Sequence, residues 1–176
     1  MKDIELKLVA ELMKNSRRSE RLLAKALGVT QPTVGRMIRK LEKEGVIKEY
    51  TVIPDFSKLG FTIMGSTRFQ MNETPVDDSQ RACMGMMDKF AGFVGVQGDC
   101  AGKNRLLLSF YASFSEYCEA LRLLKANPIV NVDNVDTFMV DLSNKTRYKI
   151  LSMIPVANYL LERLAREEQR RKEKTK

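Results

Sequence analysis

The sequence predicts an α+β protein with two domains, a helical N-terminal domain followed by one in which strand and helix patterns alternate. Apolar residues recur at helical spacing in residues 1–45, whereas residues 61–142 switch between strand and helix periods. Charge divides along the same lines. Residues 1–50 hold twelve basic and seven acidic groups, residues 51–142 eight and eleven, and residues 143–176 ten and four. This distribution favours a polyanion-binding module joined to a domain with another role.

Residues 1–45 predict three helices. The first repeats an apolar residue every four positions, at Ile4, Leu8 and Leu12. Ser19 is placed to cap a short second helix, which Gly28 ends as a residue in the left-handed conformation. Thr30 is placed to cap the third helix, with Pro32 in its first turn, where a missing N–H costs little.

A short helix, a tight turn and a capped helix describe a helix-turn-helix. A helical wheel groups the apolar residues of the third helix on one side: Val34, Met37, Ile38 and Leu41. The opposite side carries Pro32, Thr33, Arg36, Arg39, Lys40 and Lys43. No acidic residue occurs from Gly28 through Leu41, which is typical of a helix that lies against phosphates. A solvated basic face on an ordinary three-helix bundle is the competing interpretation.

The candidate DNA contacts fall into two classes. We expect Gln31, Thr33 and Arg36, near the start of the third helix, to reach base edges. The expected phosphate contacts are Arg39, Lys40, Lys43, Arg17 and Arg18. Gly35 is unusual inside a helix, and it fits either close approach to DNA or close packing on the second helix.

Residues 46–53 are β-prone and predict a strand, and residues 51–60 join the two domains. Beyond them the predicted elements are a strand at 61–71, a helix at 82–90, strands at 93–96 and 106–112, a helix at 114–124 and a strand at 135–142. This β-α-β-β-α-β order is the ferredoxin-like arrangement, assigned here to residues 61–142. Its helices cover one face of an antiparallel sheet and leave the other face for a partner or a ligand.

Residues 143–176 form an extension, predicted to be helical at least through Ala165. An apolar stripe at helical spacing comprises Ala157, Leu160, Leu161 and Leu164. Such a stripe must be buried, either on its own domain or across a subunit contact. The basic end, residues 170–176, is expected to fray and to add non-specific attraction to DNA.

Several function classes are disfavoured. The chain has no histidine, the commonest metal ligand and general base, and its three cysteines form no CxxC pair. We therefore predict no catalytic residues, no metal and no cofactor. No window of 18 residues is apolar enough to span a membrane, and Met1-Lys2-Asp3 opens no signal peptide, so a cytoplasmic protein is expected.

Four segments carry a resemblance to a known family. They are Ile4–Leu12, Leu23–Thr30, Arg39–Ile47 and Lys58–Gly60. Over roughly residues 1–142 the chain resembles the Lrp/AsnC, or feast/famine, transcriptional regulators. The resemblance implies a winged helix-turn-helix, a ferredoxin-like domain and dimers made by pairing the sheets. It also implies assembly into tetramers or octamers, with small effectors, usually amino acids, bound between dimers.

The chain departs from the family pattern where a Gly-x-x-Asp turn normally leads into the third strand. Here the segment is Gly102-Lys103-Asn104-Arg105, with arginine in place of aspartate, and Gly98-Asp99 is an alternative match. Arginine offers a planar fork suited to carboxylate or phosphate rather than to an ammonium group. We hypothesise that this turn senses an anionic metabolite or binds no effector. An Arg105 that pairs with a neighbouring carboxylate and senses nothing is the alternative.

The preferred interpretation is a sequence-specific DNA-binding transcriptional regulator. A two-fold dimer would place two recognition helices in successive major grooves, about 34 Å apart, on a pseudo-palindromic site. One alternative is an effector-sensing or heteromeric subunit of the same fold with weak or no DNA binding. Another is an enzyme like the Lrp-related proteins that decarboxylate a tetrapyrrole, which the absence of histidine disfavours.

Overall fold

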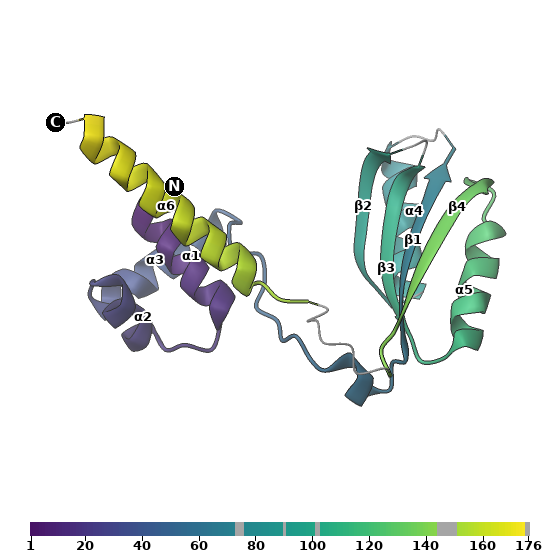
Figure 1. Ribbon diagram of the computed structural model, residues 1–176, viewed down its shortest axis with the longest axis horizontal. Coiled ribbons are helices and arrows are strands. Elements are labelled where there is room, and N and C mark those ends of the chain that lie inside the picture. The colour runs from purple at the N-terminus through teal and green to yellow at the C-terminus, as the bar shows by residue number, and fades with distance from the viewer. Residues whose placement is uncertain (73–75, 90, 101–102, 144–150, 175–176) are drawn as a thin grey trace. The chain divides into compact units, whose positions relative to one another are not determined.

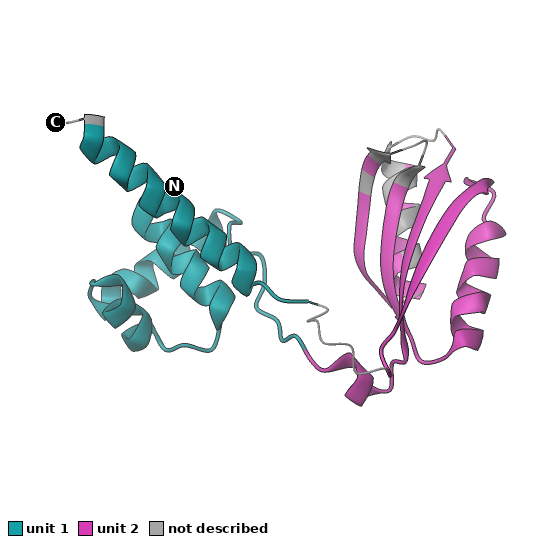
Figure 2. Ribbon diagram, viewed as in Figure 1, with its two compact units in different colours: residues 1–53, 148–176 teal, residues 54–147 magenta. Residues whose placement is uncertain are grey.

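The computed structural model describes residues 1–72, 76–89, 91–100, 103–143 and 151–174. Its elements are α1 Asp3–Lys14, α2 Glu20–Leu27, α3 Gln31–Lys43, a 3-10 turn at Phe56–Leu59, β1 Ile63–Met71, α4 Val76–Lys89, β2 Gly92–Cys100, β3 Lys103–Tyr111, α5 Phe114–Lys125, β4 Val130–Asp141 and α6 Ile154–Lys174 (Figure 1). They form two compact units, residues 1–53 with 148–176 and residues 54–147 (Figure 2). Within the described ranges no helix is long and apolar enough to cross a membrane.

The helical unit contains the predicted helix-turn-helix. Its core is formed by Leu8, Leu12, Leu23, Ala24, Val34 and Leu41. Ser19 caps α2 by accepting the Leu22 N–H at 3.3 Å, and Gly28 ends that helix with a positive φ of 68°. Thr30 occupies the N-cap position of α3, but its hydroxyl pairs with the Thr33 hydroxyl at 2.9 Å instead of capping the backbone.

The predicted strand at residues 46–53 is not formed, and all eight residues are described. A strand needs a neighbour for its backbone groups, and the described part of the helical unit contains no other strand. Ile47 packs against the helical core, but the other apolar residues of the segment stay exposed: Val46, Tyr50, Val52 and Ile53. With α1 and Met153 they line a cavity of about 760 Å³. High β-propensity alone is therefore not enough to form a strand at residues 46–53.

The C-terminal extension is helical, as predicted, but α6 begins at Ile154 and continues to Lys174, past the point at which fraying was expected. Residues 144–150 lie outside the described residues. α6 packs against α1. The two helices run antiparallel, as two ion pairs between them show. The pairs are Asp3–Arg171 at 2.9 Å and Lys7–Glu168 at 2.8 Å. The extension thus belongs to the helical unit (Figure 2).

The second unit has the predicted β-α-β-β-α-β order, with an antiparallel sheet of order β2-β3-β1-β4. α4 and α5 lie against one face of this sheet (Figure 1). Core residues on that face are Phe69, Met71, Leu107, Tyr111, Tyr117, Ala120, Leu124 and Val130. The β4 strand begins at Val130 rather than Val135, with a register shift opposite Phe69 and Gln70.

The opposite side, called here the open face, is largely apolar, although it carries Ser66 and an ion pair between Arg68 and Asp136 at 3.7 Å. The strand register places on it Val94, Val96, Leu106, Leu108, Phe138 and Val140. Phe138 is 68% exposed and Val96 47% exposed. At one end of this face the Phe110 ring stacks against Phe56 at 3.9 Å and against Phe93 at 4.5 Å. The sheet therefore has a second, largely apolar face that the described helices of this unit, α4 and α5, do not cover.

Candidate nucleic-acid interface

α3 combines a buried apolar side with an exposed basic side. Val34 and Leu41 are fully buried in the helical core. Arg36, Arg39 and Lys43 are exposed, together with Gln31 at the start of the helix. The arrangement that the helical wheel predicts is therefore present, because burial of one side fixes which residues meet solvent.

The start of α3 is locally ordered by its own polar side chains. Thr33 is half-buried and bonded to Thr30, which leaves a short polar surface beside Gln31. The Arg36 Nε donates to the Pro32 carbonyl at 3.4 Å, so the side chain lies along the first turn of the helix. The predicted base-reading residues Gln31, Thr33 and Arg36 thus gather at one end of α3.

Lys40 is engaged within the protein. Its Nζ lies 2.7 Å from Glu5 Oε1 on α1 and 3.7 Å from Glu44 Oε1. The Glu5 side chain is only 4% exposed, and it also accepts the Lys2 backbone N–H at 2.8 Å. The hydrogen bond from Lys40 is the main cause that holds the pKa of the Glu5 carboxyl below its ordinary value. A phosphate contact by Lys40 would have to compete with Glu5, and the predicted role in DNA binding stays a prediction.

Of the two arginines before α2, one is open to solvent and the other is paired within the protein. Arg17 is exposed, whereas Arg18 is half-buried and ion-paired with Glu11. Burial opposes ionisation of Glu11, but hydrogen bonds from Lys14 and Arg18 outweigh it and keep the pKa of that carboxyl low. Of the pair, Arg17 presents its charge more openly to a phosphate.

The sequence left two interpretations of Gly35 open, and the structure favours packing. Gly35 is buried, and a Cβ at this position would lie 3.0 Å from the Glu20 carboxylate of α2. The close approach is therefore between α2 and α3. No positive φ is involved, so the requirement is for space rather than for an unusual backbone conformation.

Sequence reasoning missed the Glu5–Lys40 pair. The two residues are 35 positions apart, and the basic side of a recognition helix is normally interpreted as solvent-exposed. A signal was present in the first helix. Glu5 lies on the same stripe as Leu8 and Leu12, and a charged residue on an apolar stripe requires a partner.

The candidate effector residues lie at the end of the β2–β3 hairpin, but Arg105 is not in the turn. β3 begins at Lys103, which pairs with Cys100 of β2, so Arg105 lies two residues into the strand. Arg105 lies within β3 opposite Phe69 and is 8% exposed, on the helix-covered face. Gly98 is exposed on β2. Gly102 and the side chains of Asp99, Lys103 and Asn104 lie outside what the structure describes.

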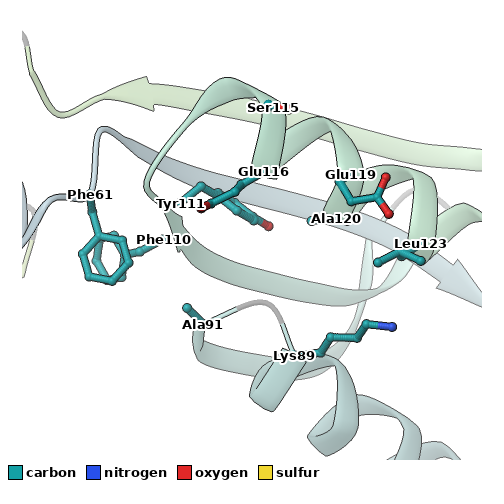
Figure 3. Close-up of a pocket in the computed structure, with 10 residues that line it drawn as sticks. All are labelled: Phe61, Lys89, Ala91, Phe110, Tyr111, Ser115, Glu116, Glu119, Ala120 and Leu123. Atoms are coloured by element: carbon teal, nitrogen blue, oxygen red, sulfur yellow. The ribbon is translucent and has the colours of Figure 1, made fainter.

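A cavity of about 430 Å³ opens between α4 and α5 (Figure 3). Lys89 lines the cavity from α4, Glu119 from α5 and Tyr111 from β3. Burial raises the pKa of the Tyr111 phenol, while hydrogen bonds from Arg122 lower the pKa of Glu119. The cavity thus offers charges of both signs around an apolar floor. Among all the described residues, including those of this cavity, no group of three His, Cys, Asp or Glu residues could hold a metal ion.

Comparison with known proteins places these features in context. Residues 1–48 match the winged helix-turn-helix DNA-binding family. An HTH-type transcriptional regulator of Pyrococcus abyssi is 30% identical over 138 residues, which cover 77% of this chain and 89% of that protein. The HTH-type regulator LrpC of Bacillus subtilis is 40% identical over 60 residues, or 34% of this chain and 42% of LrpC. The alignments to the first curated relatives span about two fifths of those proteins, 39–41%.

Solved structures share the fold over most of the chain. The structure of Bacillus subtilis LrpC covers 86% of this chain and 98% of its own, with a TM-score of 0.67 at 20% identity. A transcriptional regulator of Neisseria meningitidis, solved as a complex with L-methionine, covers 89% and 99%, with a TM-score of 0.68 at 14% identity. Both likenesses establish the two-domain fold.

The Glu5–Lys40 pair predicts an acid-dependent loss of stability. Because the folded-state pKa of Glu5 lies below its ordinary value of about 4.5, the pair stabilises the fold fully above that value. The contribution is lost as the pH falls through the lowered pKa. Thermal unfolding between pH 3 and 7, followed by circular dichroism, should show a weaker acid dependence in Glu5→Gln and a lower stability near neutral pH. Glu44→Gln, at the exposed partner of the same lysine, is the control and should resemble the wild type.

Proposed function

The chain belongs to the Lrp/AsnC family of helix-turn-helix transcriptional regulators, and from this premise we propose that it binds specific DNA sites and regulates transcription from them. The observation that carries the proposal is α3, whose apolar side is locked in the core while Arg36, Arg39 and Lys43 meet solvent. The relatives reported above are regulators rather than enzymes, in agreement with the prediction made from the residues.

Within this proposal the contacts divide by their position on α3. Gln31, Thr33 and Arg36 read base edges, since they lie at the first turns, which enter a major groove. Arg39, Lys43 and Arg17 contact phosphates and set affinity, because their charges are exposed. Lys40 and Arg18 join them only where DNA displaces Glu5 or Glu11.

We also propose a homodimer formed through the open face of the sheet. An apolar sheet face is normally covered, and pairing two such faces removes both from water. A two-fold axis then fits a pseudo-palindromic site with half-sites about 34 Å apart. Assembly of dimers into tetramers or octamers, and a cytoplasmic location, belong to the same proposal.

A small-molecule effector completes the proposal, and the methionine complex of the Neisseria relative supports an effector site in this fold. We place it first at the hairpin end, with Gly98, Asp99, Gly102, Lys103, Asn104 and Arg105 as candidates. The cavity between α4 and α5 is the alternative location.

A second function is favoured by one observation. Lys40 and Arg18, two of the predicted phosphate contacts, are already paired with Glu5 and Glu11, which lowers the positive charge available to DNA. This favours an interaction subunit of the same fold with weak DNA binding. A gel shift with DNA that flanks the protein's own gene distinguishes the two functions, because only the regulator shifts a specific fragment.

Two arginines of α3 should fail in different ways. Arg36→Ala should weaken binding to the best site by about 1–3 kcal/mol and relax preference at one base position. Arg39→Ala should weaken all sequences alike and reduce the salt slope of log affinity by about 1. Fluorescence anisotropy on matched and scrambled sites measures both effects. Arg163→Ala, at an exposed position on α6, is the control. Wild-type affinity in both α3 variants would contradict the assignment of α3 to the DNA interface.

Dimerisation should depend on the open face and not on the helical side. Phe138→Lys should weaken the dimer by about 2 kcal/mol or more, because it removes a large apolar contact and inserts a charge. Phe114→Lys on α5 is the matched control, since Phe114 is 60% and Phe138 68% exposed. Sedimentation velocity over a concentration series should show dissociation in the first variant alone. Dissociation in both, or in neither, contradicts a dimer through this face.

The effector hypothesis predicts anion binding that depends on Arg105. Calorimetry and thermal shift should detect a small dicarboxylate or phosphate compound and little response to neutral amino acids. Arg105→Lys should weaken binding about tenfold, because lysine keeps the charge but loses the two-point hydrogen bond. Lys89→Gln, in the α4–α5 cavity, is the control and should bind normally. Micromolar binding of leucine that Arg105→Ala leaves unchanged would end the hypothesis.

A further inference from the structure

The first two turns of α1 connect α1 to two other helices through alternate charged residues. Asp3 pairs with Arg171 at 2.9 Å and Lys7 with Glu168 at 2.8 Å, both on α6. Between them, Glu5 pairs with Lys40 of α3 at 2.7 Å. The residues that α6 contacts therefore flank the residue that holds the recognition helix.

Apolar packing supports the α1–α6 contact. Ala157 is fully buried and Leu164 is 2% exposed, so both belong to a dry interface. Ala10 is also fully buried, and it follows Lys7 by three positions on the same side of α1. Small residues on both helices permit a shorter distance between the two helix axes.

The helical unit is small without α6. The core cluster of residues 1–53 contains only six buried apolar residues, and a domain of this size is marginally stable. α6 adds 21 residues to it. It also follows β4 along the chain, so the second unit is joined to the helical unit by two covalent connections rather than one.

We propose that α6 is a positioning element for DNA binding, a role that rests on the function proposed above. By holding α1 at Asp3 and Lys7, α6 fixes the turn of α1 from which Glu5 anchors Lys40. The direction of α3, and with it the set of phosphates and bases that α3 reaches, depends on this α1–α6 contact. The extension acts through position and not through its own positive charge.

Charge-neutral exchanges test the proposal in the full-length chain. Glu168→Lys with Arg171→Glu reverses the α6 side of both pairs and leaves the net charge unchanged. Asp3→Lys with Lys7→Glu reverses the α1 side in the same neutral way. Each exchange alone converts two attractions into two repulsions, and the fourfold variant restores both pairs with inverted sign. Because the net charge is constant, general attraction to DNA is constant too.

We expect the α6 exchange to weaken binding to the best site about three- to tenfold, since exposed ion pairs are individually weak. Its salt slope should also fall, because a displaced α3 reaches fewer phosphates. The fourfold variant should return to within about twofold of the wild type. Glu162→Lys with Arg166→Glu, on the solvent side of α6, is the matched control and should bind normally.

Circular dichroism and sedimentation should be used to check that each variant is as folded and as associated as the wild type at the temperature of the assay. A smaller salt slope of log affinity in a folded variant indicates that α3 is displaced. Simple unfolding would instead lower the active fraction and leave the slope unchanged. Wild-type affinity in the folded α6 exchange, or failure of the fourfold variant to regain affinity, would overturn the proposal. If the wild type and Arg39→Ala bind all DNA equally weakly, the proposed DNA-binding function is wrong, and the positioning role of α6 is excluded with it.

Discussion

The constraint on which the molecule depends is a four-stranded sheet with large apolar residues on both faces, of which α4 and α5 cover one. Phe69, Leu107 and Tyr111 are enclosed beneath α4 and α5, whereas Phe138 and Val96 on the open face remain in contact with water. Exposed apolar patches of this kind usually mark an interaction surface. The same constraint leads to a two-fold axis if a second copy supplies the cover, and two-fold symmetry is what a pair of recognition helices needs in order to meet successive major grooves.

Polar anchoring, rather than apolar packing alone, gives the recognition helix its direction. Burial of Val34 and Leu41 sets which side of α3 faces the core. The nearly buried Glu5 carboxylate adds a polar constraint, because it requires the Lys40 ammonium close by. Gly35 leaves room for Glu20 of α2 where the two helices approach closely. These two contacts reinforce the orientation that the apolar core sets.

Most of the fold could be predicted from the sequence because periodicity and capping are local. Gly28 ends α2 with the positive φ that its position predicted, and the β-α-β-β-α-β order follows from alternating periods. The failures involve distant residues. Residues 46–53 have the composition of a strand but no neighbouring strand in the described helical unit. The partner of Lys40 was hidden for the same reason, since a helical wheel records one helix and not what packs on it.

The two candidate effector locations lie on the same face of β3 but at opposite ends of it. Arg105 and Tyr111 both face the helices, and six residues at about 3.3 Å each separate them by roughly 20 Å. A small ligand cannot touch both, so the two sites are chemically independent. Arg105 is 8% exposed and already interacts within the protein, so an anion at the hairpin must displace an existing contact. The cavity beside Tyr111 is already open, and a ligand there displaces only water. Occupation of the hairpin would therefore change the structure around Arg105, whereas occupation of the cavity would fill space between α4 and α5.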